Sequence, residues 1–271
     1  MIIVLHVVAL LLYAAAAGIQ IGSLARGQRV VPRSAPAVLG VAVIVHAVAL
    51  GFFVAAYHEL PLVGLAASIS TLAFLLGVIL LVLAHFSEAR PVGLVLLPIV
   101  AALLLLALLL HIRPAGQVLA FRGAWLAFHV VLGFIGYVGL AVAFAAGLLY
   151  LLQFRELKSK KFGRLFRFFP ALATLDRLGR LGLQIGFPSL TLNLILGWAW
   201  TIRFRHTFAF ATPQVIWGII TWVVFVAAMV AGSSGAARAR RSALASVVGF
   251  AVVVAAYVIL RVAITGGRLF L

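Results

Sequence analysis

The sequence of 271 residues has no cysteine and only four acidic residues. Without cysteine the chain can form no disulfide, and it has no thiol nucleophile, Cys-ligated iron–sulfur cluster or covalent c-type haem site. Charged residues make up 9% of the chain and hydrophobic residues 66%, whereas a typical soluble domain is about a quarter charged and about half apolar. This composition excludes a soluble globular protein, and the large apolar fraction excludes a disordered one.

Eight apolar stretches are each long enough to cross a hydrocarbon core of about 30 Å as a helix. Proline, glycine and charged residues separate them, and strand-type alternation is absent. The sequence therefore predicts an all-α polytopic membrane protein, a single integral membrane domain over 1–271 with a bundle of about eight transmembrane helices. The predicted spans are 2–22, 37–57, 62–86, 92–112, 124–154, 183–202, 215–232 and 244–265.

Lysine and arginine give the chain a formal net charge of +17, and most of them fall in the loops after the first, third, fifth and seventh predicted spans. By the positive-inside rule these loops are cytoplasmic, and both termini lie on the outer side of the cell inner (plasma) membrane. We interpret the basic excess as topology and contact with anionic membrane lipids, and not as a nucleic-acid interface. The longest such loop, 155–182, is predicted to be basic and amphipathic, with an interfacial helix on the inner leaflet.

Tryptophan and histidine are unevenly distributed. All five tryptophans and most of the seven histidines fall in the outer half of the predicted spans, whereas an aromatic belt normally marks both interfaces. One interpretation is that the indoles anchor one interface while the imidazoles hydrogen-bond to headgroup water. The other is an outward-facing site for a flat apolar ligand such as haem, whose iron commonly takes a histidine ligand.

The predicted helix 124–154 gives the haem interpretation a geometry. At 100° per residue, His129, Gly133 and Gly136 lie close to one line, which predicts a groove beneath an imidazole. The alternative is ordinary close packing of helices on small residues. We favour packing for the small residues at 139–147 and leave both alternatives open for the glycines next to the histidine.

His46 lies near the middle of a predicted span without a charged neighbour in sequence. Its alternatives are a hydrogen bond to another helix, metal ligation or proton relay. A relay is disfavoured because none of the four acidic residues falls in mid-membrane.

Several segments resemble, in order and spacing, the motifs of one family. The stretch 124–130 (AWLAFHV) resembles a W-L-x-x-H-V motif, and 186–191 (GFPSLT) resembles G-F-P-x-L-T. Segments 197–200 (GWAW) and 219–223 (IITWV) are similar to G-x-x-W-A and I-T-W-L-V motifs. The chain thus resembles the cytochrome c assembly proteins of the CcsA/CcmC type, most closely over a core at 124–232.

The sequence also departs from this family in places. The family's W-D-P-K-E core is replaced here by TFAFATPQ at 207–214, and two of the family's axial histidines have no counterpart. These departures favour the shorter eight-helix branch, which includes HemX-like and YpjD-like proteins.

The resemblance implies a haem-handling membrane protein that binds or presents haem b, held non-covalently, at the outer half of the membrane. It implies no bond chemistry of the chain's own, and at most a part in a haem delivery or cytochrome c ligation system with other maturation components as partners. The predicted axial ligand is His129, with His46 or His206 as the second ligand. The other predicted site residues would wall the haem or meet its propionates: Trp125, Gly133, Gly136, Trp198, Trp200, Trp217, Arg203 and Arg205.

An alternative function belongs to a different class. The chain would be a HemX-like regulatory or scaffold protein without haem, and its basic loop at 155–180 would contact a haem-biosynthetic enzyme. A small-molecule permease is disfavoured because the predicted spans lack acidic residues.

Overall fold

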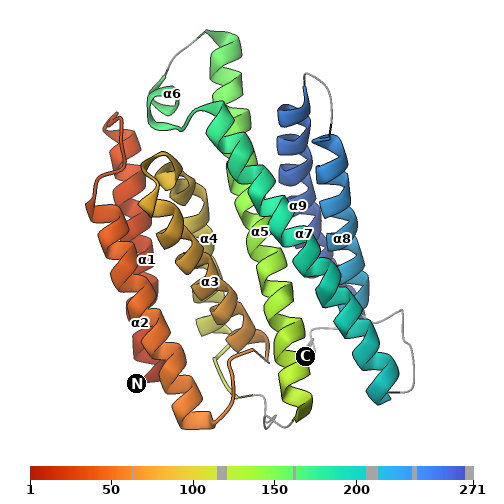
Figure 1. The fold of residues 1–271 in the computed structure, drawn as a ribbon. Coiled ribbons are helices and arrows are strands. Elements are labelled where there is room, and N and C mark those ends of the chain that lie inside the picture. Colours follow the sequence, from red (N-terminus) through yellow and green to blue (C-terminus); the bar gives the residue numbers. More distant parts are fainter. Residues whose placement is uncertain (63, 115–120, 161–162, 206–212, 234–236, 266–271) are drawn as a thin grey trace. The chain divides into compact units, whose positions relative to one another are not determined.

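The structure, a computed structural model of the chain, describes residues 1–62, 64–114, 121–160, 163–205, 213–233 and 237–265. These residues are helical and include no strand, which confirms the all-α prediction (Figure 1). Each of the eight predicted spans corresponds to one long helix, α1–α5 and α7–α9. Within the described residues, seven helices are long and apolar enough to cross a membrane, and α8 adds a shorter apolar stretch at Val215–Ala231.

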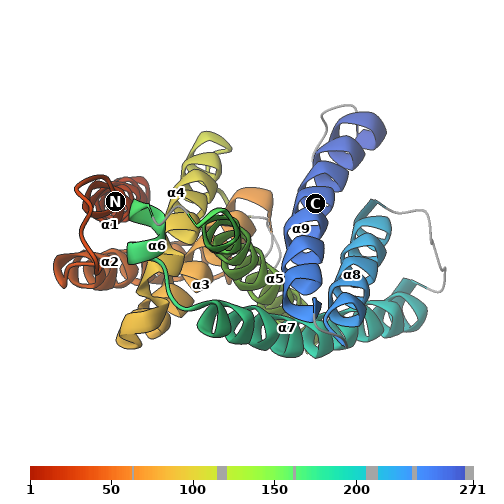
Figure 2. The same ribbon diagram turned by 90° about the horizontal axis from the view of Figure 1, so that it is seen from above.

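The chain divides into two compact units, of which the first contains Met1–Leu119 and Leu152–Leu175. In this unit α1 and α3 each pack against both α2 and α4 (Figure 2). Its helices are α1 (Ile2–Ala25), α2 (Ser34–Tyr57), α3 (Leu65–His85), the 3-10 helix η1 (Ser87–Val92), α4 (Gly93–Leu109) and α6 (Arg164–Phe168).

The helix ends in this unit follow from local backbone chemistry. Gly27, just after α1, and Gly64, just before α3, have φ angles of 71° and 87°, which residues with a side chain rarely adopt. Pro91 has no N–H to continue an α-helix and lies in η1, before α4 begins. The Nε of Arg90 donates to the carbonyl oxygen of Ala84 at 2.8 Å and holds η1 against the end of α3.

The second unit contains Ala120–Leu151 and Asp176–Leu271. In this unit, parts of α5 and of α8 and α9 lie along one side of α7 (Figure 2). Its helices are α5 (Phe121–Ser159, up to Leu151), α7 (Leu172–Trp200, from Asp176), the π-helical turn η2 (Thr201–Arg205), α8 (Pro213–Ala231) and α9 (Arg238–Thr265).

Small residues let the backbones of α5 and α7 touch. A Cβ atom on Gly139 of α5 would collide with the carbonyl oxygen of Gly182 and would lie 2.8 Å from the Cα of Gly186, both on α7. Further along α5, a Cβ on Gly147 would lie 2.9 Å from the carbonyl oxygen of Ala243 on α9. The small residues at 139–147 therefore serve helix packing, as we favoured from the sequence.

The segment predicted as a loop with a separate interfacial helix contains the end of α5, the short helix α6 and the start of α7. The structure extends α5 to Ser159 and begins α7 at Leu172, so the amphipathic stretch forms the first turns of a helix that continues into the predicted span. Its apolar face is buried at Leu175. Asp176 forms an ion pair with Arg180 one turn along and lies 3.7 Å from Arg238 Nη2 of α9. The predicted span began at 183, later than α7, because the charged residues at the start of α7 made this stretch too polar to be counted in the span.

A matched pair of substitutions tests the α5–α7 contact. In Gly182→Ala the new Cβ would lie 2.5 Å from the carbonyl oxygen of Gly139, whereas in Gly179→Ala it would meet only Ala146 Cβ at 3.9 Å. We expect Gly182→Ala to lower the free energy of unfolding by about 1–3 kcal/mol because the helices are overpacked. Gly179→Ala should be neutral or slightly stabilising because alanine favours helix. Thermal unfolding in detergent compares them, and equal melting temperatures would contradict the close approach.

Candidate functional site around His129

His129 of α5 is held against α7 by a reciprocal pair of contacts with one residue. The ring nitrogen Nδ1 lies 2.8 Å from the backbone carbonyl oxygen of Asn193. In return, the side-chain Nδ2 of Asn193 donates to the backbone carbonyl oxygen of His129 at 2.5 Å. Each residue therefore bonds the backbone of the other, and the imidazole is fixed relative to both α5 and α7.

These contacts determine which ring nitrogen of His129 carries the proton. A carbonyl oxygen only accepts, so Nδ1 must donate to Asn193 and carry the hydrogen. Nδ2 of Asn193 also lies 3.1 Å from Nδ1, but it donates to the nearer carbonyl of His129. The Nε2 atom therefore keeps its lone pair, and within the described part of the chain it has no hydrogen-bond partner. A metal-binding histidine is commonly prepared in this way, with the other ring N–H donated to a backbone carbonyl.

Glycines make room for this arrangement. A Cβ on Gly197 of α7 would lie 2.8 Å from the ring carbon Cε1 of His129, so glycine at this position lets the imidazole approach α7 closely. A Cβ on Gly133 would lie 2.9 Å from Nδ2 of Asn193, and one on Gly136 would lie 3.1 Å from Cβ of Leu190. The groove predicted at Gly133 and Gly136 is therefore filled by α7, and the packing alternative describes these two glycines.

The predicted tryptophans have different surroundings within the second unit. Trp125 of α5 donates its Nε1–H to the carbonyl oxygen of Leu196 at 3.1 Å, one turn along α5 from His129. Trp198 is 54% exposed, and Trp200 is half-buried. Trp217 packs inside the unit, where it stacks on Tyr137 with ring centroids 4.7 Å apart. The indole of Trp125 thus contacts the same stretch of α7 as the imidazole, whereas that of Trp217 lies in the packed interior.

The other predicted ligands of the haem are only partly described. Arg203 is exposed and lies in η2, directly after α7. Arg205 ends that turn, but its side chain lies outside the described part, and His206 lies outside the described residues altogether. Their predicted roles at the site stay predictions.

His46 lies in the first unit, in a cluster of buried polar side chains from three helices. Its Nε2 lies 3.0 Å from Oγ of Ser70, and its Nδ1 lies 3.4 Å from the hydroxyl of Tyr13. The Nε2 of His6 lies 3.1 Å from the same Ser70 Oγ. Both ring nitrogens of His46 are therefore engaged, and His46 would have to leave this cluster to bind iron as a second ligand.

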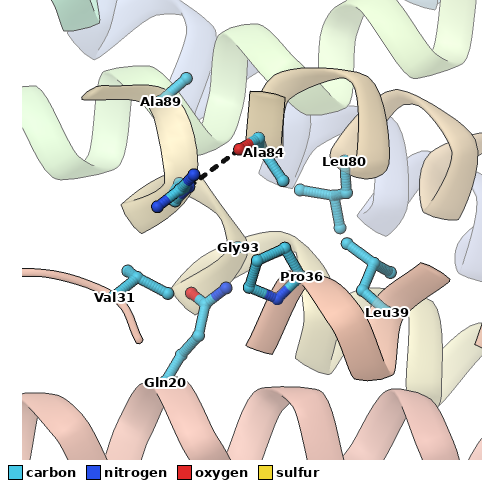
Figure 3. A pocket seen from close by; sticks show the side chains of 9 residues that line it. Gln20, Val31, Pro36, Leu39, Leu80, Ala84, Ala89 and Gly93 are labelled. Atoms are coloured by element: carbon cyan, nitrogen blue, oxygen red, sulfur yellow. Dashed lines mark hydrogen bonds between the residues drawn. The ribbon is translucent and has the colours of Figure 1, made fainter. Parts of the chain in front are cut away.

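The first unit also contains a small pocket between α1, α2, α3 and the start of α4 (Figure 3). Gln20 of α1 is buried in its wall, and its Oε1 has no hydrogen-bond partner among the described residues. Leu39, Leu80 and Pro36 supply apolar walls (Figure 3). None of the predicted haem-site residues lines this pocket.

Comparison with known proteins agrees with this architecture. The sequence profile described as "Cytochrome C assembly protein" matches residues 62–266, which is most of the chain. The chain belongs to this cytochrome c assembly protein family. The match begins just before α3 and includes His129 and Asn193, whereas α1 and α2 precede it.

Three named relatives are similar to the chain over only part of their length. The chain is 30% identical over 156 residues to the cytochrome c biogenesis protein CcsA of Guillardia theta, covering 52% of each. It is 27% identical over 136 residues to CcsA of Chlamydomonas reinhardtii, covering 49% of this chain and 37% of the relative. With CcsA of Synechococcus elongatus the identity is 34% over 84 residues, covering 31% and 26%. The chain thus spans about half or less of the length of these relatives, and the comparisons give no support to the HemX-like alternative.

Sequence reasoning singled out His129 but did not identify the two α7 residues that contact it, Asn193 and Gly197. A signal was present, because 186, 190, 193 and 197 are spaced by four, three and four residues and so lie on one helix face. A small or polar residue occurs at three of these positions. In this cytochrome c assembly protein, that face of α7 packs against the face of α5 that carries His129, Gly133 and Gly136.

We expect Asn193→Ala to destabilise the protein because it removes the amide that bonds the carbonyl oxygen of His129. Loss of a buried hydrogen bond costs about 1–3 kcal/mol. Ser189→Ala is the control, because the Ser189 hydroxyl bonds only a carbonyl of its own helix, that of Ile185. Thermal unfolding in detergent should separate the two variants, and equal melting temperatures would show that the Asn193 contact contributes nothing.

Proposed function

We propose that this protein is a membrane component of a cytochrome c maturation system that binds haem b non-covalently through Nε2 of His129. The observation that carries the proposal is the hydrogen bond from His129 Nδ1 to the carbonyl oxygen of Asn193, at 2.8 Å. It fixes the tautomer in which Nε2 is a free electron-pair donor, and imidazole in this form is a common axial ligand of haem iron. Membership of the cytochrome c assembly family makes haem the expected metal group.

The donor set fits haem better than a bare metal ion. Within the described residues no three His, Asp or Glu side chains come together, and a structural zinc site needs about four such ligands. Haem brings four of its own nitrogens, so one oriented imidazole is enough to hold its iron from one side. Bound haem would supply the iron porphyrin to be delivered, and this chain would hold and orient it.

The surrounding residues receive roles that follow from their positions. Trp125, one turn from His129, would lie against the porphyrin edge, and its bond to Leu196 would keep the indole in place. Arg203, exposed directly after α7, would pair with a propionate. We assign Trp217 to support of α5 through its stacking on Tyr137. The positive-inside rule assigns this end of α5 and α7 to the outer side of the membrane.

The proposed role is to hold haem and pass it on. The chain has no cysteine to form a thioether with haem, and the thiols that receive haem would belong to an apocytochrome. Relatives named CcsA support a place in cytochrome c biogenesis. The partners would be other components of that system.

Replacing His129 tests the proposal directly. We expect protein purified in detergent after haem supply to have a Soret band, and the His129→Ala variant to lose or strongly weaken it because the iron loses its axial nitrogen. His85→Ala is the matched control, because His85 is an exposed histidine at the end of α3. Added imidazole should restore the band in His129→Ala. An unchanged spectrum and haem content in that variant would overturn the assignment.

Gly197→Ala should displace the ring without removing it. The new Cβ would lie 2.8 Å from His129 Cε1, so the imidazole must shift away from α7. We expect reduced haem occupancy and a shifted Soret maximum, while Gly179→Ala behaves as wild type. Absorption spectroscopy of both variants at equal protein concentration is the measurement. Wild-type spectra in Gly197→Ala would place the haem elsewhere.

A further inference from the structure

The first unit holds a chain of hydrogen-bonded polar side chains that the haem proposal does not use. We call the residues Tyr13, His46, Ser70 and His6 the buried histidine cluster; each of them is 0% exposed. They come from α1, α2 and α3. Polar side chains are costly to bury inside a membrane protein, so a fully buried group of four is a candidate functional site.

The direction of each hydrogen bond in the cluster can be derived. The carbonyl oxygen of Ile2 only accepts, so Nδ1 of His6, 2.8 Å away, carries the hydrogen and Nε2 of His6 accepts. Ser70 must then donate its one proton to His6. Its Oγ accepts from Nε2–H of His46, and Nδ1 of His46 accepts from the hydroxyl of Tyr13. Two imidazole Nε2 atoms thus converge on one hydroxyl oxygen, at 3.1 and 3.0 Å.

We propose that His6, His46 and Ser70 form a binding site for Cu(I), with the two Nε2 atoms as its ligands. Each Nδ1 already lies beside an oxygen, that of Ile2 or that of Tyr13, which is the outer support that metal-binding histidines commonly have. His6 already has the tautomer needed to bind a metal, with the hydrogen on Nδ1 and a lone pair on Nε2. His46 reaches it by moving its proton from Nε2 to Nδ1, where the oxygen of Tyr13 can accept, so binding releases no net proton.

The number and charge of the donors select the ion. Zinc requires about four ligands and calcium about six to eight oxygens, whereas the cluster offers two nitrogens and one hydroxyl. All three donors are neutral, so the full charge of the ion enters a buried site. The electrostatic cost of that transfer rises with the square of the charge and is about four times larger for a divalent ion than for a monovalent one. Cu(I) is monovalent, accepts two or three donors and binds imidazole.

This site is separate from the proposed haem ligand. His6, Tyr13 and His46 precede the segment that matches the family, which begins at residue 62. The rings of His6 and His46 pack edge to face with centroids 5.4 Å apart, and the ring of Phe74 makes a second edge-to-face contact with His46 at 5.6 Å. The cluster is therefore closed to a macrocycle. The chain also has no cysteine, so no thiolate competes for Cu(I).

A copper titration tests the proposal in the full-length protein. Detergent-purified protein would be titrated with Cu(I) under reducing, anaerobic conditions against a coloured Cu(I) chelator. We expect one equivalent to bind, and His6→Gln and His46→Gln to weaken that binding by more than about tenfold. Glutamine keeps a hydrogen-bonding group toward Ser70. His85→Gln is the matched control and should bind as wild type.

A spectroscopic measurement on the wild type alone keeps the test decisive if a variant fails to fold. X-ray absorption of the copper-loaded protein should show scattering from two imidazoles and no sulfur shell, and excess Zn(II) should not displace the copper. Ser70→Ala keeps both imidazoles and should still bind one equivalent. Binding no tighter in wild type than in a monodisperse His46→Gln variant, or a sulfur shell around copper, would overturn the proposal. A His129→Ala variant that loses haem should still bind copper.

Discussion

The direct backbone contact between α5 and α7 is the constraint on which the rest of the second unit depends. Gly139 faces Gly182 and Gly186 with no side chain between the helices, and this contact fixes the register of two antiparallel helices. On α7, Asn193 lies two turns beyond Gly186, and on α5, His129 lies two turns before Gly136. Because the register is fixed at the glycines, Asn193 and His129 lie opposite each other. A shift of one residue, about 1.5 Å, would break both of the reciprocal bonds.

This register also changes the meaning of the glycines beside His129. From the sequence, Gly133 and Gly136 could equally leave a groove for a ligand or admit a neighbouring helix. In the structure Gly133 admits the Asn193 side chain, whose amide reaches the His129 carbonyl only because no Cβ stands in the way. Gly133, which in the sequence suggested an open groove, thus makes room for the hydrogen bond between Asn193 and His129. At this contact Nε2 of His129 is left without a hydrogen-bond partner among the described residues.

The sequence predicted the eight long helices, and it singled out His129, because both inferences depend on local pattern. Apolar length determines a span, and His129 belongs to a short motif. The start of α7 at Leu172 and the role of Asn193 were missed for a common reason. Each depends on what a helix face meets, and a helical wheel shows which residues share a face but not what covers it. To predict that the His129 face of α5 packs against the small and polar residues of α7, one would need the register between the two helices.

Two histidines in this protein illustrate how partners decide what a buried imidazole can do. Both ring nitrogens of His46 have hydrogen-bond partners, so the proposed copper site forms only if the proton of His46 moves from Nε2 to Nδ1. In His129, Nδ1 donates a hydrogen bond to the carbonyl oxygen of Asn193, and Nε2 keeps a lone pair that can bind a metal. His46 is fully buried and His129 is partly exposed, but the free ring nitrogen is identified by the hydrogen-bond directions, which depend on the chemistry of each partner. In a protein without cysteine and with few acids, imidazoles are the main candidate metal ligands, and the roles that we propose for His129 and His46 differ because of the number of ring nitrogens that already have a hydrogen-bond partner.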